Sequence, residues 1–441
     1  MRARTLLSWT VTILSLGQGP ASADDWPQWL GPQRDSVWRE TGIVDRFPAE
    51  GLAVKWRTPV GLGYSGPAVA GQRVVVMDYL PREGEVVNNP GARARLEGAE
   101  RILCLDAATG EVLWTHAYDR AYDISYPGGP RCTPTVDGDR VYTLGAEGDL
   151  LCLALDDGRV IWSKDLKREY RTEAPFWGFA SHPLVAQDLL YCLAGGEGSV
   201  VVALDKQTGA EVWRALSASS AGYCPPTMIE HAGTRQLLIW HPESLNALDP
   251  RTGEVYWSVP LKPGYEMSIT APRQLGNRLF ASGIGSVAAM LQLEEAKPAA
   301  EVLWRGQVKN AVYSANATPF LEDGMIYGAD CMSGALVCAR MEDGERLWET
   351  FQPTSGDRRA SHGTAFLVKH ADRFFLFSEK GDLILARLSP ERYEELDRFH
   401  VLEPTNEAFG RDVVWSHPAF AHRCVFARND KELVCVSLAA D

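Results

Sequence analysis

Aromatic, histidine and arginine side chains recur beside a short motif that the chain repeats. The motif reads YSGP, RCTP, ASHP, YCPP, NATP and WSHP, with SITAP and SHGTA as related forms. Side chains of these types suit a planar or anionic ligand if they converge at one place. The candidate ligand-binding residues are Tyr64, Arg131, Trp177, His182, Tyr223, Asn316, His362, Trp415 and His417. They would equally suit a structural role, in which they fill a channel and satisfy loop backbones.

Three Ser-His pairs, at residues 181–182, 361–362 and 416–417, raise metal or nucleophile chemistry as a second interpretation. A zinc site needs three or four ligands around one point. A serine beside a histidine in a strand also points to the opposite face. The chain has no GxSxG elbow, no HExxH motif and no glycine-rich phosphate loop before a helix. We therefore expect no catalytic residue and no metal site.

A repeated element that ends in tryptophan must position these side chains. The stretch LDAATGEVLW is followed by the near-copies LDDGRVIW, LDKQTGAEVW and LDPRTGEVYW. The tryptophans lie 44 to 58 residues apart, a period typical of propeller blades, and an eighth, degenerate copy ends near Phe399. The expected docking tryptophans are Trp56, Trp114, Trp162, Trp213, Trp257, Trp304 and Trp348.

Each copy contains short strands separated by tight turns. β-Branched and aromatic residues fill the strands, and Gly, Asp and Asn separate them. In the Asp-x-x-Thr-Gly turn, glycine permits a positive φ and the polar side chains bond the backbone. The tryptophan after this turn is expected to lie between neighbouring sheets and join them. The only helix candidate is short, at residues 390–396.

The first and last copies are incomplete in complementary ways. The first is an outer strand at residues 52–58, and the last ends after three strands. The sequence therefore predicts an all-β, eight-bladed β-propeller of four-stranded antiparallel blades, whose last blade is closed by the N-terminal strand. We expect a signal peptide at residues 1–23, an arm packed on the propeller at 24–51, and a single propeller at 52–441.

The motif [Ala/Leu]-Leu-Asp-x-x-Thr-Gly-x-x-x-Trp resembles the repeat of the pyrroloquinoline quinone (PQQ) propellers. That superfamily includes quinoprotein alcohol dehydrogenases and BamB-type proteins of outer-membrane β-barrel assembly. The segments DDWPQWLGPQRDSVWRETG, GYSGPAV and WHPESLNALDP are similar to an exported, planctomycete-type branch. The resemblance covers residues 52–441 and implies the fold, whereas the shared motif joins blades and has no catalytic group.

For function, the resemblance implies either a binding propeller or a quinoprotein dehydrogenase. The dehydrogenases bind PQQ over a tryptophan floor with Ca²⁺ held by acidic and amide side chains, and they often have a vicinal cysteine pair. Trp177 or Trp415 would supply the floor and Asn316 an amide. The chain has no adjacent cysteines and no acidic residue in the candidate set. It also lacks the lipid-anchoring cysteine of BamB-type proteins after the signal.

Long connections at residues 115–131, 163–180 and 398–414 share one face, which we expect to be the binding face. The polar insertion at 81–100 reads as a mobile surface loop. The arm at 24–51 contains three tryptophans, so we expect it to lie on the propeller flank rather than free in solvent.

The N-terminus is typical of an export signal. Arg2 and Arg4 precede an apolar run, and Ala21–Ala23 provides a cleavage site after Ala23. We expect a periplasmic or secreted protein with no transmembrane segment, because the apolar run is too short. A net charge of −13 disfavours nucleic acid. Several of the nine cysteines occupy a repeat position that holds alanine in other copies, so we expect mostly unpaired, structural thiols.

We therefore predict an exported, non-enzymatic binding or scaffold propeller, monomeric and without a resident cofactor. Its partner would be an exported protein or an envelope polymer on the long-loop face, for example in cell-envelope protein assembly. One alternative is a PQQ-dependent dehydrogenase with PQQ and Ca²⁺. The other is a carbohydrate-binding or carbohydrate-active propeller, which needs paired carboxylates if it is catalytic; Glu266 and Asp412 are loose candidates.

Overall fold

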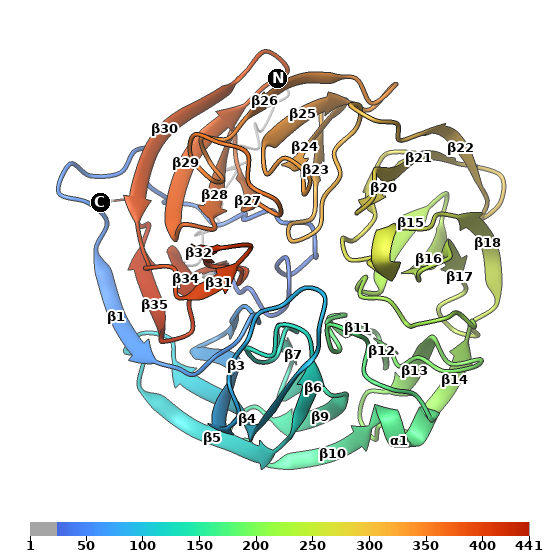
Figure 1. Ribbon diagram of the computed structural model, residues 1–441, viewed down its shortest axis with the longest axis horizontal. Coiled ribbons are helices and arrows are strands. Elements are labelled where there is room, and N and C mark those ends of the chain that lie inside the picture. Colours follow the sequence, from blue (N-terminus) through green and yellow to red (C-terminus); the bar gives the residue numbers. More distant parts are fainter. Residues whose placement is uncertain (1–23, 441) are drawn as a thin grey trace, which may run out of the picture.

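Eight β-sheets surround a central axis, as Figure 1 shows. The computed structural model describes residues 24–440. Each sheet contains an antiparallel set of four strands, and the sheet of blade one gains a fifth strand, β6. The eight-bladed, all-β propeller predicted from the repeat is therefore confirmed.

The blades follow one another along the chain from the innermost to the outermost strand. Blade one contains β2 (Ala68–Ala70), β3 (Arg73–Glu83), β4 (Ala94–Asp106), β5 (Val112–Asp119) and β6 (Tyr122–Ile124). Blade two contains β7 (Thr135–Asp137), β8 (Arg140–Leu144), β9 (Asp149–Ala154) and β10 (Val160–Asp165). Blade three contains β11 (Leu184–Ala186), β12 (Leu189–Leu193), β13 (Val201–Asp205) and β14 (Glu211–Ala215). Blade four contains β15 (Thr227–His231), β16 (Thr234–Trp240), β17 (Ser244–Leu248) and β18 (Val255–Pro260).

The second half of the ring repeats this order. Blade five contains β19 (Arg273–Leu275), β20 (Arg278–Gly283), β21 (Val287–Leu293) and β22 (Ala300–Arg305). Blade six contains β23 (Phe320–Glu322), β24 (Met325–Ala329), β25 (Leu336–Arg340) and β26 (Arg346–Thr350). Blade seven contains β27 (Ala365–His370), β28 (Arg373–Ser378), β29 (Asp382–Leu388) and β30 (Tyr393–His400). Blade eight contains β33 (Ala419–Ala421), β34 (Cys424–Arg428), β35 (Glu432–Ser437) and β1 (Val54–Pro59).

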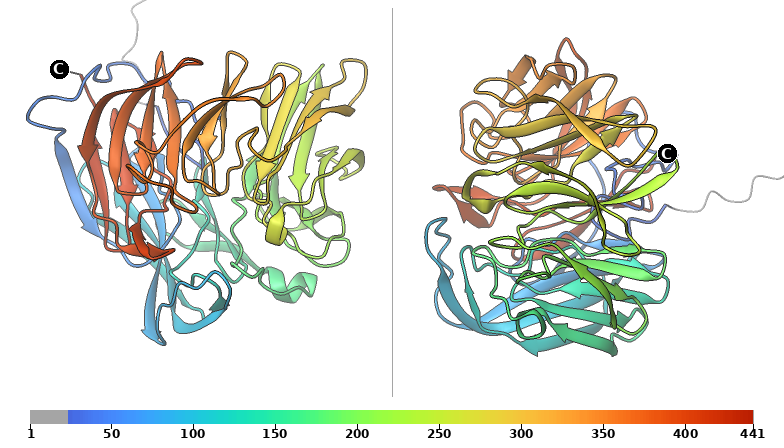
Figure 2. Two further views of the ribbon diagram at one scale, coloured as in Figure 1. Left: turned by 45° about the horizontal axis from the view of Figure 1, so that its top comes forward. Right: turned by 90° about the vertical axis from the view of Figure 1, so that its right-hand side faces the viewer.

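The connections between blades carry the remaining elements, which share one face of the ring in Figure 2. They are α1 (Leu166–Tyr170), the 3-10 turn η1 (Gly264–Glu266), and the hairpin of β31 (Asn406–Ala408) and β32 (Arg411–Val413). The N-terminal arm lies at the opposite face. It bridges to blade one through Trp26 and Val69, to blade seven through Val37 and Lys369, and to blade eight through Ile43 and Ala439.

The Asp-x-x-Thr-Gly turn forms as its side chains dictate. In blade one, Asp106 Oδ1 accepts hydrogen bonds from the backbone N–H of Ala108 and Thr109, each at 2.9 Å. Gly110 has a φ of +73°, and a Cβ there would lie 2.6 Å from the Trp56 ring. Trp56 Nε1 donates to Ala107 O at 3.0 Å, so blade eight docks on the turn of blade one.

Most of the repeat tryptophans dock in this way on the next blade. Trp114, Trp162, Trp213, Trp304 and Trp348 donate to backbone carbonyls there at 2.8–3.0 Å. A register shift precedes each of these residues in its strand, as a β-bulge that turns the indole toward the neighbour requires. Trp257 differs and donates to Gln236 Oε1 of its own blade at 2.8 Å.

Two local expectations were wrong. Residues 393–396, part of the expected helix, belong to outer strand β30. Ser389 Oγ accepts from the N–H groups of Glu391 and Arg392, which is a helix-start signal, yet pairing with β29 continues the chain as a strand. The insertion at 81–100 is not a loose loop either, because β3 and β4 extend into it and leave residues 84–93 as the connection.

Candidate functional site

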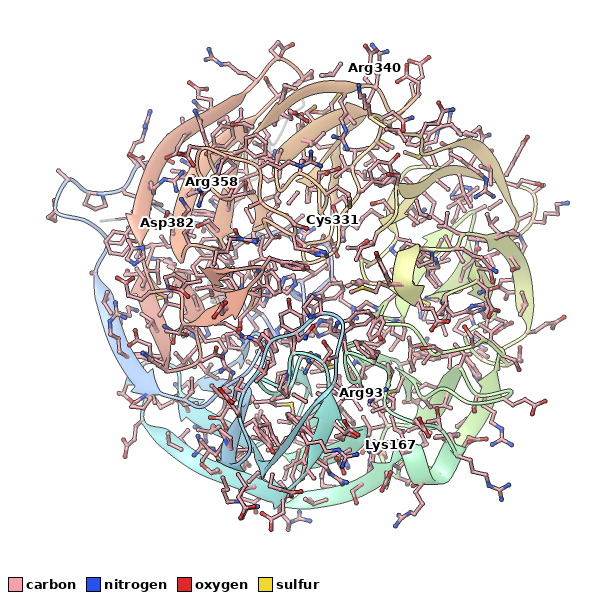
Figure 3. All side chains as sticks on the ribbon, viewed as in Figure 1. Arg93, Lys167, Cys331, Arg340, Arg358 and Asp382 are labelled. Atoms are coloured by element: carbon pink, nitrogen blue, oxygen red, sulfur yellow. The ribbon has the colours of Figure 1, made fainter. Side chains whose placement is uncertain are left out.

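The nine candidate ligand-binding residues line one cavity of about 710 Å³ on the axis. We call this cavity the cup. All nine lie in connections that lead from an outer strand to the next innermost strand, which places them on the long-loop face. In Figure 3, Arg93 of the β3–β4 connection and Cys331 of blade six lie on opposite sides of the centre. The structure thus brings together side chains that span 354 positions of the sequence, from Tyr64 to His417.

Two histidines and a tryptophan close the inner end of the cup. The His182 and His417 rings lie 6.4 Å apart, at right angles. Trp29 of the N-terminal arm stacks on His182, with ring centroids 4.7 Å apart and planes 11° apart. Trp29 meets His417 edge-on at 5.8 Å. The arm therefore plugs the channel from the opposite face, beyond the flank position expected from sequence.

The floor histidines are neutral. Thr133 N donates to His182 Nδ1 at 2.9 Å, so the ring proton of neutral His182 resides on Nε2. Burial, together with His417 and Arg34, holds the pKa of His182 well below its usual range. Burial also lowers the pKa of His417 to about 3. The floor is thus an uncharged aromatic surface with an N–H donor.

Aromatic rings form much of the wall. Trp177 and Tyr223 meet edge-on with centroids 5.9 Å apart. His362 stacks on Phe409 at 4.9 Å with planes 2° apart, and burial lowers its pKa to about 4. The ring centroids of Tyr126 and Trp415 lie 6.1 Å apart. Several lining residues escaped the sequence motif: Tyr126, Tyr265, Met332 and Phe409, with Pro90 and Gly91 of the β3–β4 connection.

Arg131 supplies the positive charge of the wall. Its guanidinium donates to the carbonyl oxygens of Gly129, Ser125 and Tyr126 at 2.7, 2.9 and 2.5 Å. It lies over the Tyr64 ring, 5.1 Å from the centroid. Arg131 therefore holds its own loop, as a structural role requires, and also brings a charge to the cup.

The nearby carboxylate of Glu379 lies behind the wall. Glu379 is 1% exposed and pairs with Arg411, with Nε to Oε1 at 2.8 Å. Trp415 Nε1 donates to Glu379 Oε2 at 3.3 Å, which orients the indole of the cup. Glu266 and Asp412, the loose carboxylate candidates, are absent from the residues that line the cup. The described wall thus offers no carboxylate pair for glycoside chemistry.

The Ser-His pairs form no metal site in the part of the chain that the structure describes. No group of three or more His, Cys, Asp or Glu side chains there is placed to hold an ion. His182 and His417 meet at the floor, whereas His362 stacks on Phe409 in the wall. All nine cysteines are buried and unpaired.

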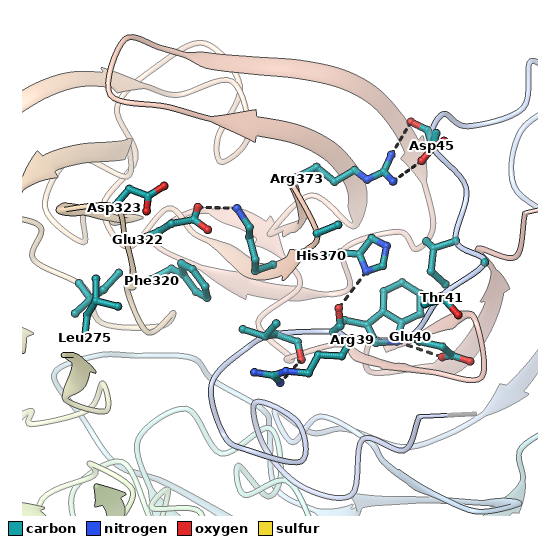
Figure 4. Close-up of a pocket in the computed structure, with 17 residues that line it drawn as sticks. Arg39, Glu40, Thr41, Asp45, Leu275, Phe320, Glu322, Asp323, His370 and Arg373 are labelled. Carbon is teal, nitrogen blue, oxygen red and sulfur yellow. Dashed lines mark hydrogen bonds and ion pairs between the residues drawn. The ribbon is translucent and has the colours of Figure 1, made fainter. Parts of the chain in front are cut away.

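A second cavity, of about 760 Å³, lies at the opposite face between the arm and blades five to seven (Figure 4). Its cationic side chains all have carboxylate partners: Lys369 pairs with Glu322 at 2.6 Å, Arg373 with Asp45, and Arg39 with Asp35. His370 Nδ1 contacts Trp38 O at 3.0 Å and so joins blade seven to the arm. These contacts bind the arm rather than leave groups free for a ligand.

Comparisons with known proteins agree with the geometry. The family model described as Outer membrane protein assembly factor BamB matches residues 98–350 and 243–441. A curated protein of that name from Moranella endobia is 22% identical over 276 residues. That alignment covers 57% of this chain and 65% of the relative, slightly less than two thirds of its length.

Solved structures show the same fold. BamB from Moraxella catarrhalis superposes with a TM-score of 0.55 and 14% identity, covering 87% of this chain and 97% of that one. A europium-containing methanol dehydrogenase gives a TM-score of 0.60 and 11% identity, covering 94% and 89%. Within residues 24–440, no helix has the length and apolarity needed to cross a membrane.

Proposed function

Because the chain belongs to the family described as Outer membrane protein assembly factor BamB, we propose that it is an exported, non-enzymatic binding propeller of the cell envelope. Its partner is an exported protein that docks on the long-loop face. The name of the family supports the envelope location and the scaffold role. The expected export signal, residues 1–23, lies outside the described residues, so a periplasmic or secreted location and a monomeric state are part of this proposal.

The observation that carries the proposal is the apolar rim of the cup, which consists of Tyr265, Met332 and Phe409. These residues line the cup and are 80%, 49% and 44% exposed. Exposed patches of large apolar side chains often mark sites that bind another molecule. The rim lies on the face that carries the long connections, which supports partner binding there.

Several residues that line the cup have a strained backbone conformation. Tyr126, Tyr265, His362 and Phe409 all have a positive φ, between 50° and 58°. A bulky residue in this region costs of order 1–3 kcal/mol and persists where the surroundings enforce it. The backbone is thus strained at four residues that line the cup, where the surrounding structure must enforce their conformation.

Site-specific photo-crosslinking in cells of the source organism tests the proposal. A benzophenone amino acid at position 265, 332 or 409 should yield a discrete adduct with one envelope protein, identified by mass spectrometry. Leu275, 40% exposed on β19 beside the opposite cavity, provides the matched control position. Adducts of equal yield from position 275, or none from the rim, would refute docking on the long-loop face.

A quinoprotein dehydrogenase is the second candidate, favoured by the Trp177 and Trp415 rings in a cavity on the axis. Ca²⁺ takes six to eight oxygen ligands, with carboxylates prominent. Among the described residues that line the cup, Asn316 is the amide and no Asp or Glu is present. The donor set therefore does not fit a Ca²⁺-bound quinone.

Thermal unfolding with PQQ, in the presence of Ca²⁺ and in the presence of a chelator, decides between the two candidates. We expect no stabilisation that depends on Ca²⁺. A cofactor present at 100 times its dissociation constant would stabilise the protein by about 2.7 kcal/mol. A Ca²⁺-dependent shift of that size would restore the dehydrogenase and justify an assay with an alcohol and a dye.

A further inference from the structure

The cup is a cavity with a single formal charge. Of the described residues that line it, Arg131 is the one charged side chain at neutral pH. The three histidines there are neutral because burial lowers the pKa of each. An apolar cavity with one cation favours a ligand that carries one negative charge.

No carboxylate of the described chain pairs with Arg131. Its side-chain partners are three backbone carbonyls. Three other part-buried arginines do have a carboxylate partner: Arg411 pairs with Glu379, Arg101 with Asp78, and Arg120 with Asp149. Partial burial of an uncompensated cation is unfavourable, so an anion that entered the cup would relieve that cost.

A second cation lies under the floor. The Arg34 guanidinium is 5.4 Å from the Trp29 ring centroid and donates to the carbonyl oxygens of Pro183 and His182 at 3.0 and 3.3 Å. It too lacks a carboxylate partner among the described residues. Two arginines without carboxylate partners thus lie at the cup, in a chain whose net charge is −13. Charges of one sign in a cavity with low-dielectric walls concentrate ligands of the other sign.

The apolar wall selects the body of the ligand. Met267, Ile269, Ile284 and Ala315 line the cup together with the aromatic rings. The hydroxyl groups of a sugar acid would lose their hydrogen bonds to water against these side chains. An aromatic ring would instead bury apolar surface there and stack on the walls.

We propose that the cup binds a small aromatic carboxylate without a metal ion, its ring between the aromatic walls and its carboxylate toward Arg131. Trp29 is a positioning residue, because it supports His182 from the arm and closes the cavity. This site is additional to partner docking on the rim. Because small-molecule binding is measured on the purified protein, either proposal can be refuted while the other still holds.

Isothermal titration of the purified protein at neutral pH tests the site with three probes. 2-Naphthoate should saturate it. The neutral isostere 2-naphthamide should bind at least about tenfold more weakly, a difference of about 1.4 kcal/mol. D-Glucuronate should also bind at least about tenfold more weakly than naphthoate, because its ring is hydroxylated.

Two substitutions separate charge from shape. Arg131→Gln should lower naphthoate affinity about tenfold, to the level of the amide, and leave the amide unchanged. Arg358→Gln, which removes the same charge from an exposed residue of the β26–β27 connection, is the matched control and should change neither. Trp29→Ala should weaken both ring ligands because the floor loses its support.

Several outcomes would overturn the proposal: no saturation of folded wild-type protein by millimolar naphthoate, equal affinity for naphthoate and naphthamide, or tighter binding of glucuronate. If Arg131→Gln fails to fold, salt provides the second measurement on the wild type. Naphthoate affinity should then fall with ionic strength while naphthamide affinity stays constant. Equal salt dependence would also refute the role of Arg131.

Discussion

Glycine in the docking turns meets two requirements at the scale of a single residue. At Gly253, φ is +77° and a Cβ would lie 2.6 Å from the Trp213 ring. Gly233 has a similar φ of +74° but open space at its Cβ position. Gly233→Ala should therefore cost about 1 kcal/mol of left-handed strain. Gly253→Ala should cost about 2 kcal/mol more because the indole must move. Urea denaturation measures both, and equal losses would show that the ring contact is unimportant.

Buried histidines make the free energy of unfolding depend on pH. Burial lowers the pKa of His417 to about 3, whereas an unfolded histidine titrates near pH 6.5. Below pH 6.5 the unfolded chain binds more protons than the folded protein does. The contribution of neutral, buried His417 to the free energy of unfolding is therefore complete above pH 6.5 and is lost as the pH falls toward 3. The loss approaches about 1.4 kcal/mol per pH unit for one histidine. His417→Gln should flatten the profile between pH 6 and 5 in guanidinium denaturation; an unchanged slope would contradict the burial effect.

The repeated motif was enough to predict eight residues of the cup, because each precedes an innermost strand at the axis. Trp29 and Tyr126 escaped for physical reasons. Trp29 belongs to the arm, whose path across the ring depends on contacts such as Trp26 with Val69 and has no repeat signal. Tyr126 adopts a φ of +52° in an irregular connection, a conformation that a tyrosine does not favour by itself.

At the scale of elements, the β3–β4 connection is tied across the mouth of the cup. Asn88 Nδ2 donates to Asn406 Oδ1 at 2.6 Å and to Glu407 O at 2.9 Å, which joins blade one to the β31–β32 hairpin. Asn88→Ala should speed hydrogen exchange in that hairpin about tenfold and change global stability by less than about 1 kcal/mol. Asn89→Ala is the control, because the Asn89 side chain bonds Gly91 N in its own connection. Equal exchange in both variants would mean that the tie is not formed in solution.

Strand pairing also explains why the expected helix at 390–396 was wrong. The local signal is real, since Ser389 caps the N–H groups of Glu391 and Arg392. A helix there would leave β29 without its outer partner, and residues from Tyr393 onward pair with β29 instead. Local propensity thus predicted the turn, and the requirement for a fourth strand decided the conformation of the residues after it. The blade count escaped this error because it rests on the tryptophan spacing.

At the scale of the whole molecule, the ring closes in blade eight, where the first and the last strand of the propeller pair. Strand β1 pairs with β35, so blade eight contains strands from both ends of the propeller. The arm adds a further bridge between Ile43 and Ala439. Closure also sets the shape of the cup, because Tyr64 follows β1 whereas Trp415 and His417 precede β33. We therefore expect substitutions at this joint to change the shape of the cup as well as the free energy of unfolding.

Arg428 is the strongest candidate for the residue that holds this joint. It is fully buried on β34 and donates to Met77 O in blade one at 2.6 Å and to Gly61 O at 2.5 Å. Arg428→Met should cost about 2–4 kcal/mol, because buried carbonyls lose their donors. Arg57→Met is the matched control: its ion pair with Glu432, at 2.8 Å, joins β1 to β35 at the exposed edge. Loss of such a pair should cost less than about 1 kcal/mol. Denaturation by guanidinium chloride measures the free energy of unfolding of both variants. An equal loss would show that buried Arg428 stabilises the closure of the ring no more than the exposed ion pair does.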